Sequence, residues 1–417
     1  MDGRISAISV GPDGKVGLED TACGEIFFFF ARFAIGLVIK DTGGELLSKQ
    51  AVHSPSHESM ALLSRLLLIP QDGDNTSSSM AAGLRSEVRN ISRDRFHDLV
   101  TLASSNHVVV RGLEVFLRMM PEAENDIRAE WARNALETER ARITLALSFL
   151  SEICAAFESE KYDVAVIKSL DHWPDLGSDL DLYTNSNSSD ISEFMKSRFD
   201  ARTAPQSWGD RLAGKWNFSI PGLPEAVEIH MGRLGQTGEQ VVVASRLAKR
   251  SRLVTIGDYA FRVPSVSDRI MISTLQRMYR HFYFRLCDIV GSAELLETDA
   301  IDFEDLRSSA MDAGIWEGVA TYLAIVSDCV KQYRGYDLAL PPFVRSAARF
   351  GGELVYYSSE FLRVPIMPQS ARLYGSQLAG LFRKRQLQNC ARLSLLPWLA
   401  TAAVVGQRIT GSDKGIW

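Results

Sequence analysis

The sequence predicts an α+β fold: a mixed sheet flanked by helices, with a small β-rich module before it and a helical domain after it. Short β-branched and alternating segments gather between residues 161 and 264, and such segments are typical of strands. Segments with apolar residues three and four positions apart lie on both sides, which is the period of helices. We therefore expect a β-rich module with a linker at 1–80, a helical segment at 81–160 that packs on the core, the sheet-containing core at 161–264 and a helical domain at 265–417.

The N-terminal module is predicted from its turns. Ile5–Val10 is strand-like and is followed by a Pro-Asp-Gly turn. We expect a helix at Met60–Ile69. Pro70–Ser79 is polar and rich in residues that break helices, so it is expected to be a linker.

The next segment is expected to be helical. Phe96–Ala103 and Val108–Met119 have one apolar face each, and Pro121 is suited to the first position of a long helix that reaches about Ser159. The stripe of that helix that should pack on the sheet is Ile143, Leu147, Leu150, Cys154 and Phe157.

One stretch organises the predicted core. Val164–Ile167 is an apolar, β-branched run that predicts a buried strand, and a loop with a proline and a glycine follows it. The next strand, Ser178–Tyr183, alternates, so Asp179 and Asp181 lie on one face. Two neighbouring carboxylates repel each other, and a cation such as Mg²⁺, which prefers oxygen ligands, removes the repulsion.

A third acid, Glu228, lies on a later predicted strand. The expected elements around it are a helix at Ser189–Phe199, a loop at Ala204–Lys215, strands at Trp216–Ile220 and Ala226–Met231, and further core segments at Val241–Leu247 and Arg262–Val263.

From Pro264 onward the chain is expected to be mainly helical. Ser265 or Ser267 caps a helix that continues to Val290, and Asp302 starts another. One face of the first helix carries charged and polar residues three and four positions apart: Arg277, His281, Arg285 and Asp288.

Three motifs of the core resemble the nucleotidyltransferase superfamily of DNA polymerase β-like fold. That superfamily has a strand ending in a small-residue turn, a strand with Asp-x-Asp and a third carboxylate on a later strand. The chain looks most like a bacterial group of uncharacterised nucleotidyltransferases over roughly Phe96–Tyr322. Ser169 stands where that group usually has glycine, which allows close approach to a phosphate. The matching residues are Ile167-Lys168-Ser169, Asp179-Leu180-Asp181 and Glu228-Ile229-His230.

The resemblance implies a polymerase β-like catalytic core and Mg²⁺-dependent nucleotidyl transfer. Asp179, Asp181 and Glu228 would be the catalytic residues and the ligands of two Mg²⁺ ions, which clamp the attacking and leaving oxygens. A nucleoside triphosphate (NTP) is the implied donor: the acceptor attacks its α-phosphorus, and pyrophosphate leaves. Glu228 is the candidate for second-metal ligand or general base. The structural alternative is that alternating acids mark the solvent face of a strand.

Further residues are candidates for binding the nucleotide. Ser169 and Ser178 contact phosphates or only cap strand ends, and Lys168 neutralises a phosphate or is an ordinary lysine at a strand end. His230 shares the face of Glu228, where it hydrogen-bonds a ligand carboxylate or is structural. The polar face of the C-terminal helix lines the nucleotide cleft or is a salt-bridged surface.

The composition and the motifs that the sequence lacks argue against several classes of protein. A net charge of −5 gives no general attraction to nucleic acid, so no DNA partner is expected. Glycine-rich nucleotide loops, zinc spacings and Gly-x-Ser-x-Gly are absent from the sequence. The five scattered cysteines and the lack of a signal peptide favour a cytoplasmic protein. Ile26–Ile39 contains Arg32 and is about half a membrane span long, so no membrane span is expected.

The expected partners are a nucleotide and a small-molecule or peptide acceptor, as in natural-product tailoring. One alternative keeps the chemistry and changes the acceptor to a protein or a tRNA end, as in toxin-like enzymes. The other alternative is a non-catalytic nucleotide-binding module.

Overall fold

The computed structural model describes residues 55–69, 75–120, 126–298, 301–358, 360–399 and 401–402, all within the unit Ser48–Trp417. Residues 1–54 of the predicted β-rich module lie outside the described residues. The predicted helix at Met60–Ile69 is confirmed as α2 (Pro55–Leu68). None of the helices in these ranges is both long enough and apolar enough to cross a membrane.

The linker predicted at 70–79 is wrong in its second half, where α3 (Asn75–Arg89) begins. Leu84 and Val88 of this helix are buried in the core. Tertiary packing of this apolar face therefore stabilises a helix whose first turns are polar and look like a linker.

The mixed sheet is confirmed. Its strand order is β1 (Ala165–Val166), β2 (Asp179–Thr184), β5 (Ala226–Met231), β4 (Lys215–Ser219) and β3 (Arg202–Thr203). Strands β2 and β5 are parallel, and the other neighbours are antiparallel. The register places Asp181 directly opposite Glu228, so the two side chains leave the sheet on the same face.

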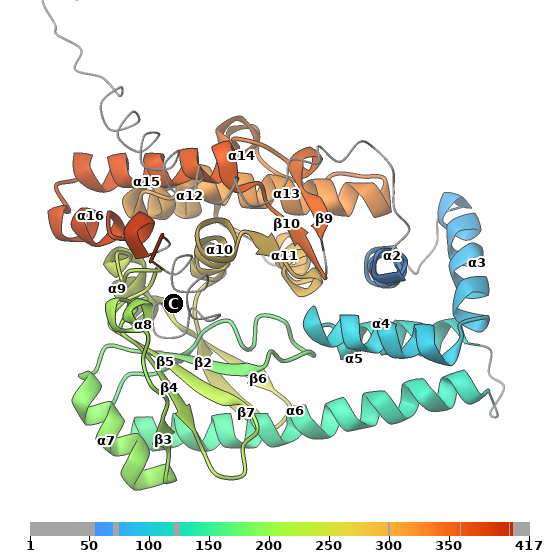
Figure 1. Ribbon diagram of the computed structural model, residues 1–417, viewed down its shortest axis with the longest axis horizontal. Helices are drawn as coiled ribbons and strands as arrows, with labels where there is room; N and C mark the ends of the chain where they lie inside the picture. The colour runs from blue at the N-terminus through green and yellow to red at the C-terminus, as the bar shows by residue number, and fades with distance from the viewer. Residues whose placement is uncertain are drawn as a thin grey trace, which may run out of the picture. The chain divides into compact units, whose positions relative to one another are not determined.

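Helices lie on both sides of the sheet, and the long α6 (Ile127–Ser159) runs beneath it (Figure 1). The predicted stripe from Ile143 to Phe157 is buried there. The helix begins at Ile127 and not at 121, because the Asp126 side chain caps it by accepting from the Arg128 N–H at 2.8 Å. The helices of this part are α4 (Arg93–Ser105), α5 (Val109–Met119), α6 (Ile127–Ser159) and α7 (Ser188–Phe199).

The loop between β1 and β2 is held against α5. Val108 at the N-cap of α5 makes no side-chain cap, and Asp175 from the loop replaces it. The Asp175 carboxylate accepts the Val110 N–H at 2.6 Å and the Arg111 N–H at 3.3 Å. This tertiary cap fixes the loop that leads into Asp179.

The single helix predicted from Ser265 to Val290 is wrong. It divides into α10 (Val266–Thr274), the π-helix η1 (Leu275–His281), β8 (Tyr283–Phe284) and α11 (Leu286–Thr298). Phe282 takes a left-handed φ of 55°, which ends the helix. Strand β8 then pairs with β10 (Phe361–Arg363), a distant segment that local helical spacing could not reveal.

Two segments of the core also differ from the prediction. The loop predicted at Ala204–Lys215 contains α8, which Ser207 and Asp210 start with a reciprocal capping box. Val241–Leu247 lies in α9, and the strand that contains Arg262 pairs in a separate sheet. The remaining elements are α8 (Trp208–Ala213), α9 (Val241–Arg250), β6 (Arg252–Ile256), β7 (Tyr259–Val263), α12 (Phe303–Ala313), α13 (Trp316–Arg334), α14 (Pro342–Ala347), η2 (Gly352–Leu354), β9 (Tyr356–Ser358), η3 (Ile366–Ser370), α15 (Ala371–Arg383) and α16 (Leu387–Leu393).

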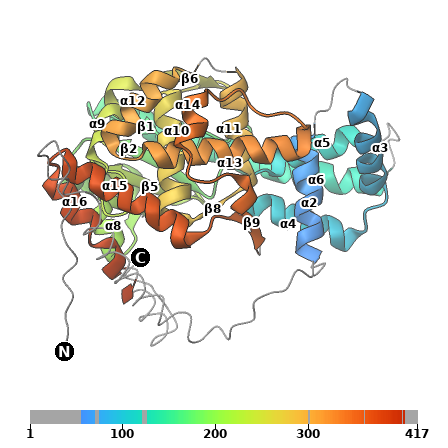
Figure 2. The same ribbon diagram turned by 90° about the horizontal axis from the view of Figure 1, so that it is seen from above.

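Two hydrophobic clusters meet at β2. Leu180 and Leu182 belong to the cluster that includes α6. Tyr183 belongs to the second cluster, which includes α10 to α13, called here the C-terminal helices. These helices lie over the sheet in the view from above (Figure 2). Asp179 and Asp181 share the face of Tyr183, so they point toward the C-terminal helices.

Candidate functional site

The predicted acids line one cavity of about 180 Å³ between the sheet and the C-terminal helices. Asp181 and Glu228 come from adjacent parallel strands, and Asp179 lies exposed at the rim. Lys168, Ser169 and Ser178 line the same cavity. The structure therefore brings together the predicted site residues; His230 contacts Glu228 but does not line this cavity.

Two lysines neutralise the buried carboxylates. The Lys168 ammonium contacts Asp181 Oδ1 and lies 3.3 Å from Glu228 Oε1, so it bridges the two acids. Lys215, at the start of β4, places its ammonium 2.6 Å from Glu228 Oε2. The sequence analysis missed Lys215, because its proximity depends on the antiparallel pairing of β4 with β5.

The turn after β1 aims Lys168 at the acids. Lys168 has a φ of 64°, which is uncommon for a residue other than glycine, and the Ser169 N–H donates to the Ile167 carbonyl at 2.7 Å. The Ser169 hydroxyl accepts the Asp181 N–H at 2.7 Å and donates to the Asp179 carbonyl at 3.3 Å. Ser169 therefore fixes the turn to β2, and its polar groups are engaged within the protein.

The electrostatic environment separates the two buried acids. Burial raises the pKa of Asp181 to about 8, although the Lys168 ammonium acts in the opposite direction. Burial would also raise the pKa of Glu228, but Lys168 and His230 hold it well below its usual range. Glu228 is therefore ionised at neutral pH, and Asp181 is the acid that takes up a proton more readily.

The ligand atoms of Asp181, Glu228 and His230 lie within 4.8 Å of one another, which is close enough to hold a metal ion. His230 Nε2 is 2.8 Å from Glu228 Oε1, and burial lowers the pKa of this imidazole to about 4. The neutral ring thus donates to Glu228 and orients it, as partners of metal ligands commonly do. Carboxylate oxygens remain as the ligands, which suits Mg²⁺ or Mn²⁺.

A basic wall faces the carboxylates across the cavity. It is formed by η1 and the segment after it, which contribute Arg277, Arg280, His281 and Arg285. Arg277 Nε lies 2.7 Å from Asp288 Oδ2, whereas Arg280 and Arg285 form no ion pair within the described part of the chain. Of the predicted polar face, Arg277, His281 and Arg285 line the cavity and Asp288 does not, and the helix that was expected to carry all four is broken.

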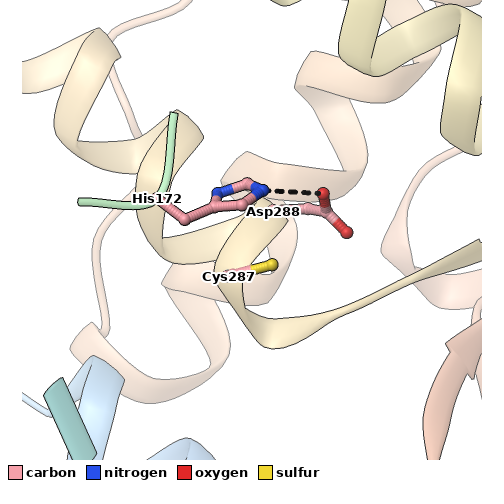
Figure 3. Close-up of side chains that lie close together, drawn as sticks. All are labelled: His172, Cys287 and Asp288. Atoms are coloured by element: carbon pink, nitrogen blue, oxygen red, sulfur yellow. Dashed lines mark ion pairs between the residues drawn. The ribbon is translucent and has the colours of Figure 1, made fainter. Parts of the chain in front are cut away.

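A second group of possible ligands supports this wall. His172, Cys287 and Asp288 offer ligand atoms within 4.8 Å of one another, and Figure 3 shows His172 Nε2 facing Asp288 Oδ1 at 4.0 Å. Burial raises the pKa of the Cys287 thiol well above its usual range, so no thiolate is available. Asp288 is engaged by Arg277 and by the Arg285 N–H at 2.7 Å. Asp288 therefore anchors Arg277, and the group is a poor metal site.

No family model matches the chain, and no curated protein is significantly similar to it. The chemistry of the cavity therefore carries the functional conclusion.

Proposed function

We propose that the protein is a Mg²⁺-dependent nucleotidyltransferase with a polymerase β-like core, acting on a hydroxyl or similar group of a small molecule or peptide. The observation that carries the proposal is the pairing of Asp181 with Glu228 in register on parallel strands, facing the basic wall across one cavity. Carboxylates for a divalent ion and arginines for phosphates are the two requirements of phosphoryl transfer from a nucleotide.

The residues present fit the metal. Asp181 and Glu228 offer oxygen ligands, with Asp179 at the rim as a third. The Lys168 ammonium already occupies the position between Asp181 and Glu228, so that position favours a cation. When bound there, Mg²⁺ supplies neutralisation of phosphate charge and acidification of the acceptor hydroxyl.

The chain's own groups perform the remaining tasks. The acceptor oxygen bonds to the α-phosphorus while the bond to pyrophosphate breaks. Asp181, which takes up a proton more readily than Glu228, is placed to accept the acceptor's proton, and the ionised Glu228 supplies a ligand oxygen. Lys168, Arg280 and Arg285 carry the charges that stabilise the departing pyrophosphate.

Nucleotide binding is tested by thermal denaturation with ATP, GTP, CTP and UTP, each with and without Mg²⁺. A ligand at a hundred times its dissociation constant adds roughly 2.7 kcal/mol to the free energy of unfolding. We expect a metal-dependent rise of Tm with at least one nucleotide. No rise with any of them would count against the proposal.

A non-catalytic nucleotide-binding module is the second candidate, because Lys168 already neutralises both buried acids. Lys168→Met distinguishes the two. If the acids form a metal site, as catalysis by the proposed mechanism requires, this variant binds Mn²⁺ about tenfold more tightly than the wild type, because a competing cation is removed. Calorimetric titration measures this affinity.

Lys215→Met is the matched control, since Lys215 pairs with Glu228 and forms no ion pair with Asp181 in the described part of the chain. It should tighten Mn²⁺ binding less than Lys168→Met does. Absence of Mn²⁺ binding from the wild type and from both variants would favour the non-catalytic module.

Metal affinity should rise with pH. The pKa of Asp181 is about 8 in the metal-free site, so below that pH a proton occupies the carboxylate and competes with the metal. We expect Mn²⁺ to bind at least several-fold more weakly at pH 6 than at pH 8, because the protonated fraction of Asp181 rises as the pH falls below its raised pKa. Calorimetry at constant ionic strength checks this, and a pH-independent affinity would contradict it.

A further inference from the structure

Three guanidinium groups surround the ring of Tyr283. The Cζ atoms of Arg277, Arg285 and Arg363 lie 5.6, 5.9 and 5.1 Å from its centroid. The three arginines come from η1, from the residue after β8 and from β10, so distant segments converge on one ring. Tyr283 itself stacks on Phe361 with the centroids 4.4 Å apart, which gives the group a rigid base.

The register of the small sheet creates this arrangement. Strands β8 and β10 are antiparallel, and Arg363 lies directly opposite Tyr283. Side chains that are directly opposed on neighbouring strands touch, so the Arg363 guanidinium is held over the aromatic face. The C-terminal part of the chain therefore contributes a cation beside the cavity.

The positive charge of this group is not balanced within the described residues. Asp288 pairs with Arg277, whereas Arg285 and Arg363 form no ion pair there. Arg277 is only 2% exposed, and its Nη1 has no hydrogen-bond partner; the same is true of the buried Arg285 Nε. Gathering like charges with unsatisfied donors is costly unless an anion binds to them.

The anion is best matched by a phosphoryl group. Three guanidinium charges less the Asp288 carboxylate leave about two positive charges, and a phosphate monoester carries about two negative charges near neutral pH. A guanidinium group also commonly donates two parallel hydrogen bonds to two oxygens of one phosphate. Arg277, Tyr283 and Arg285 line the same cavity as Asp181, so the phosphoryl group belongs to a molecule that also reaches the carboxylates.

We propose that Arg277, Arg285 and Arg363 around Tyr283 form a phosphoryl-binding site, which takes the terminal phosphate of the donor or a phosphate carried by the acceptor. Only the choice between these two sources rests on the proposed nucleotidyl transfer. The site itself requires no metal.

The test measures calorimetric binding of inorganic tripolyphosphate to the full chain in EDTA at constant ionic strength. Arg363→Met keeps the aliphatic contact with Tyr283 and removes the charge, and it should weaken binding about tenfold or more. Arg363→Lys should recover part of the loss. Arg307→Met is the matched control, because Arg307 also lies 5.1 Å from an aromatic ring, but that ring, Phe343, does not line the cavity, whereas Tyr283 does.

Equal affinities of Arg363→Met and the wild type, or no tripolyphosphate binding by the wild type, would overturn the proposal. The source of the phosphate is then assigned by measuring how Arg363→Met changes the affinity for NTP and for nucleoside monophosphate in the presence of Mg²⁺. If Arg363→Met weakens the binding of NTP but not of the monophosphate, the site takes the donor's terminal phosphate. If it weakens the binding of tripolyphosphate alone, the site takes a phosphate of the acceptor. If tripolyphosphate binds and no nucleotide does, the site stands and the proposed function fails.

Discussion

Replacing Asp179 and Asp181 together by asparagine is expected to abolish metal-dependent nucleotide binding while the fold stays intact. Asparagine keeps the shape of each side chain but removes the charge that holds a divalent ion. Asp181 is also the acid that faces Glu228 in register. Loss of a residue that only hydrogen-bonds a metal ligand typically lowers metal affinity by roughly 10- to 100-fold. Loss of the ligands themselves should lower it further. The metal-dependent gain of about 2.7 kcal/mol at saturating nucleotide should disappear with it.

The control for this variant is Asp210→Asn. Asp210 lies 3.7 Å from the Lys215 ammonium but is not one of the residues that line the cavity. It should leave the metal-dependent rise of Tm unchanged. Circular dichroism verifies that the double variant is folded. If the double variant retained metal-dependent nucleotide binding, the assignment of these acids as metal ligands would be wrong.

Asp288→Ala should cause the largest loss of stability. Arg277 and Asp288 are each about 2% exposed in their side chains, and their charges pair at 2.7 Å. Removing the carboxylate leaves a buried guanidinium without a counter-charge, which typically costs about 3–5 kcal/mol. It also removes the acceptor of the Arg285 N–H, at the start of α11. Urea denaturation measures the change.

Asp312→Ala is the matched control for that experiment, because Asp312 pairs with Lys384 at 2.8 Å on the surface and is 63% exposed. Exposed pairs contribute about 0–1 kcal/mol. The combined variant Arg277→Met with Asp288→Leu should regain much of the stability, since replacing both members of a buried pair is often neutral. A loss of less than about 1 kcal/mol in Asp288→Ala would contradict the structural role given to this pair.

The carboxylate strand of the site was predictable from local sequence. The period-two alternation of Ser178–Tyr183 and the β-branched run before it are properties of a few consecutive residues, and both strands are present. Glu228 was predictable because it lies on a similarly patterned strand. The structure brings Asp181 close to Glu228, whereas the sequence suggested that Asp179 and Asp181 are the closest pair of acids. The contact between Asp181 and Glu228 depends on the register of β2 and β5, which the spacing of residues along the chain does not reveal.

The basic side of the site could be predicted only in part. The four-residue spacing of Arg277, His281 and Arg285 suggested a continuous helix, and all three do line the cavity. The chain nevertheless leaves the helix at Phe282, because pairing of β8 with β10 outweighs local helical preference. Arg363 comes to Tyr283 only through that pairing, so no local pattern indicates it.

Counting bound metal ions is the most direct test of the proposed enzyme. Mn²⁺ is titrated into the wild-type protein, and free Mn²⁺ is followed by electron paramagnetic resonance with each of the four NTPs as a non-hydrolysable α,β-methylene analogue. We expect about two ions per protein when the matching triphosphate is present, as in two-metal sites. If the protein holds no more Mn²⁺ than the free nucleotide does, Asp179, Asp181 and Glu228 are not the metal site of a nucleotidyltransferase.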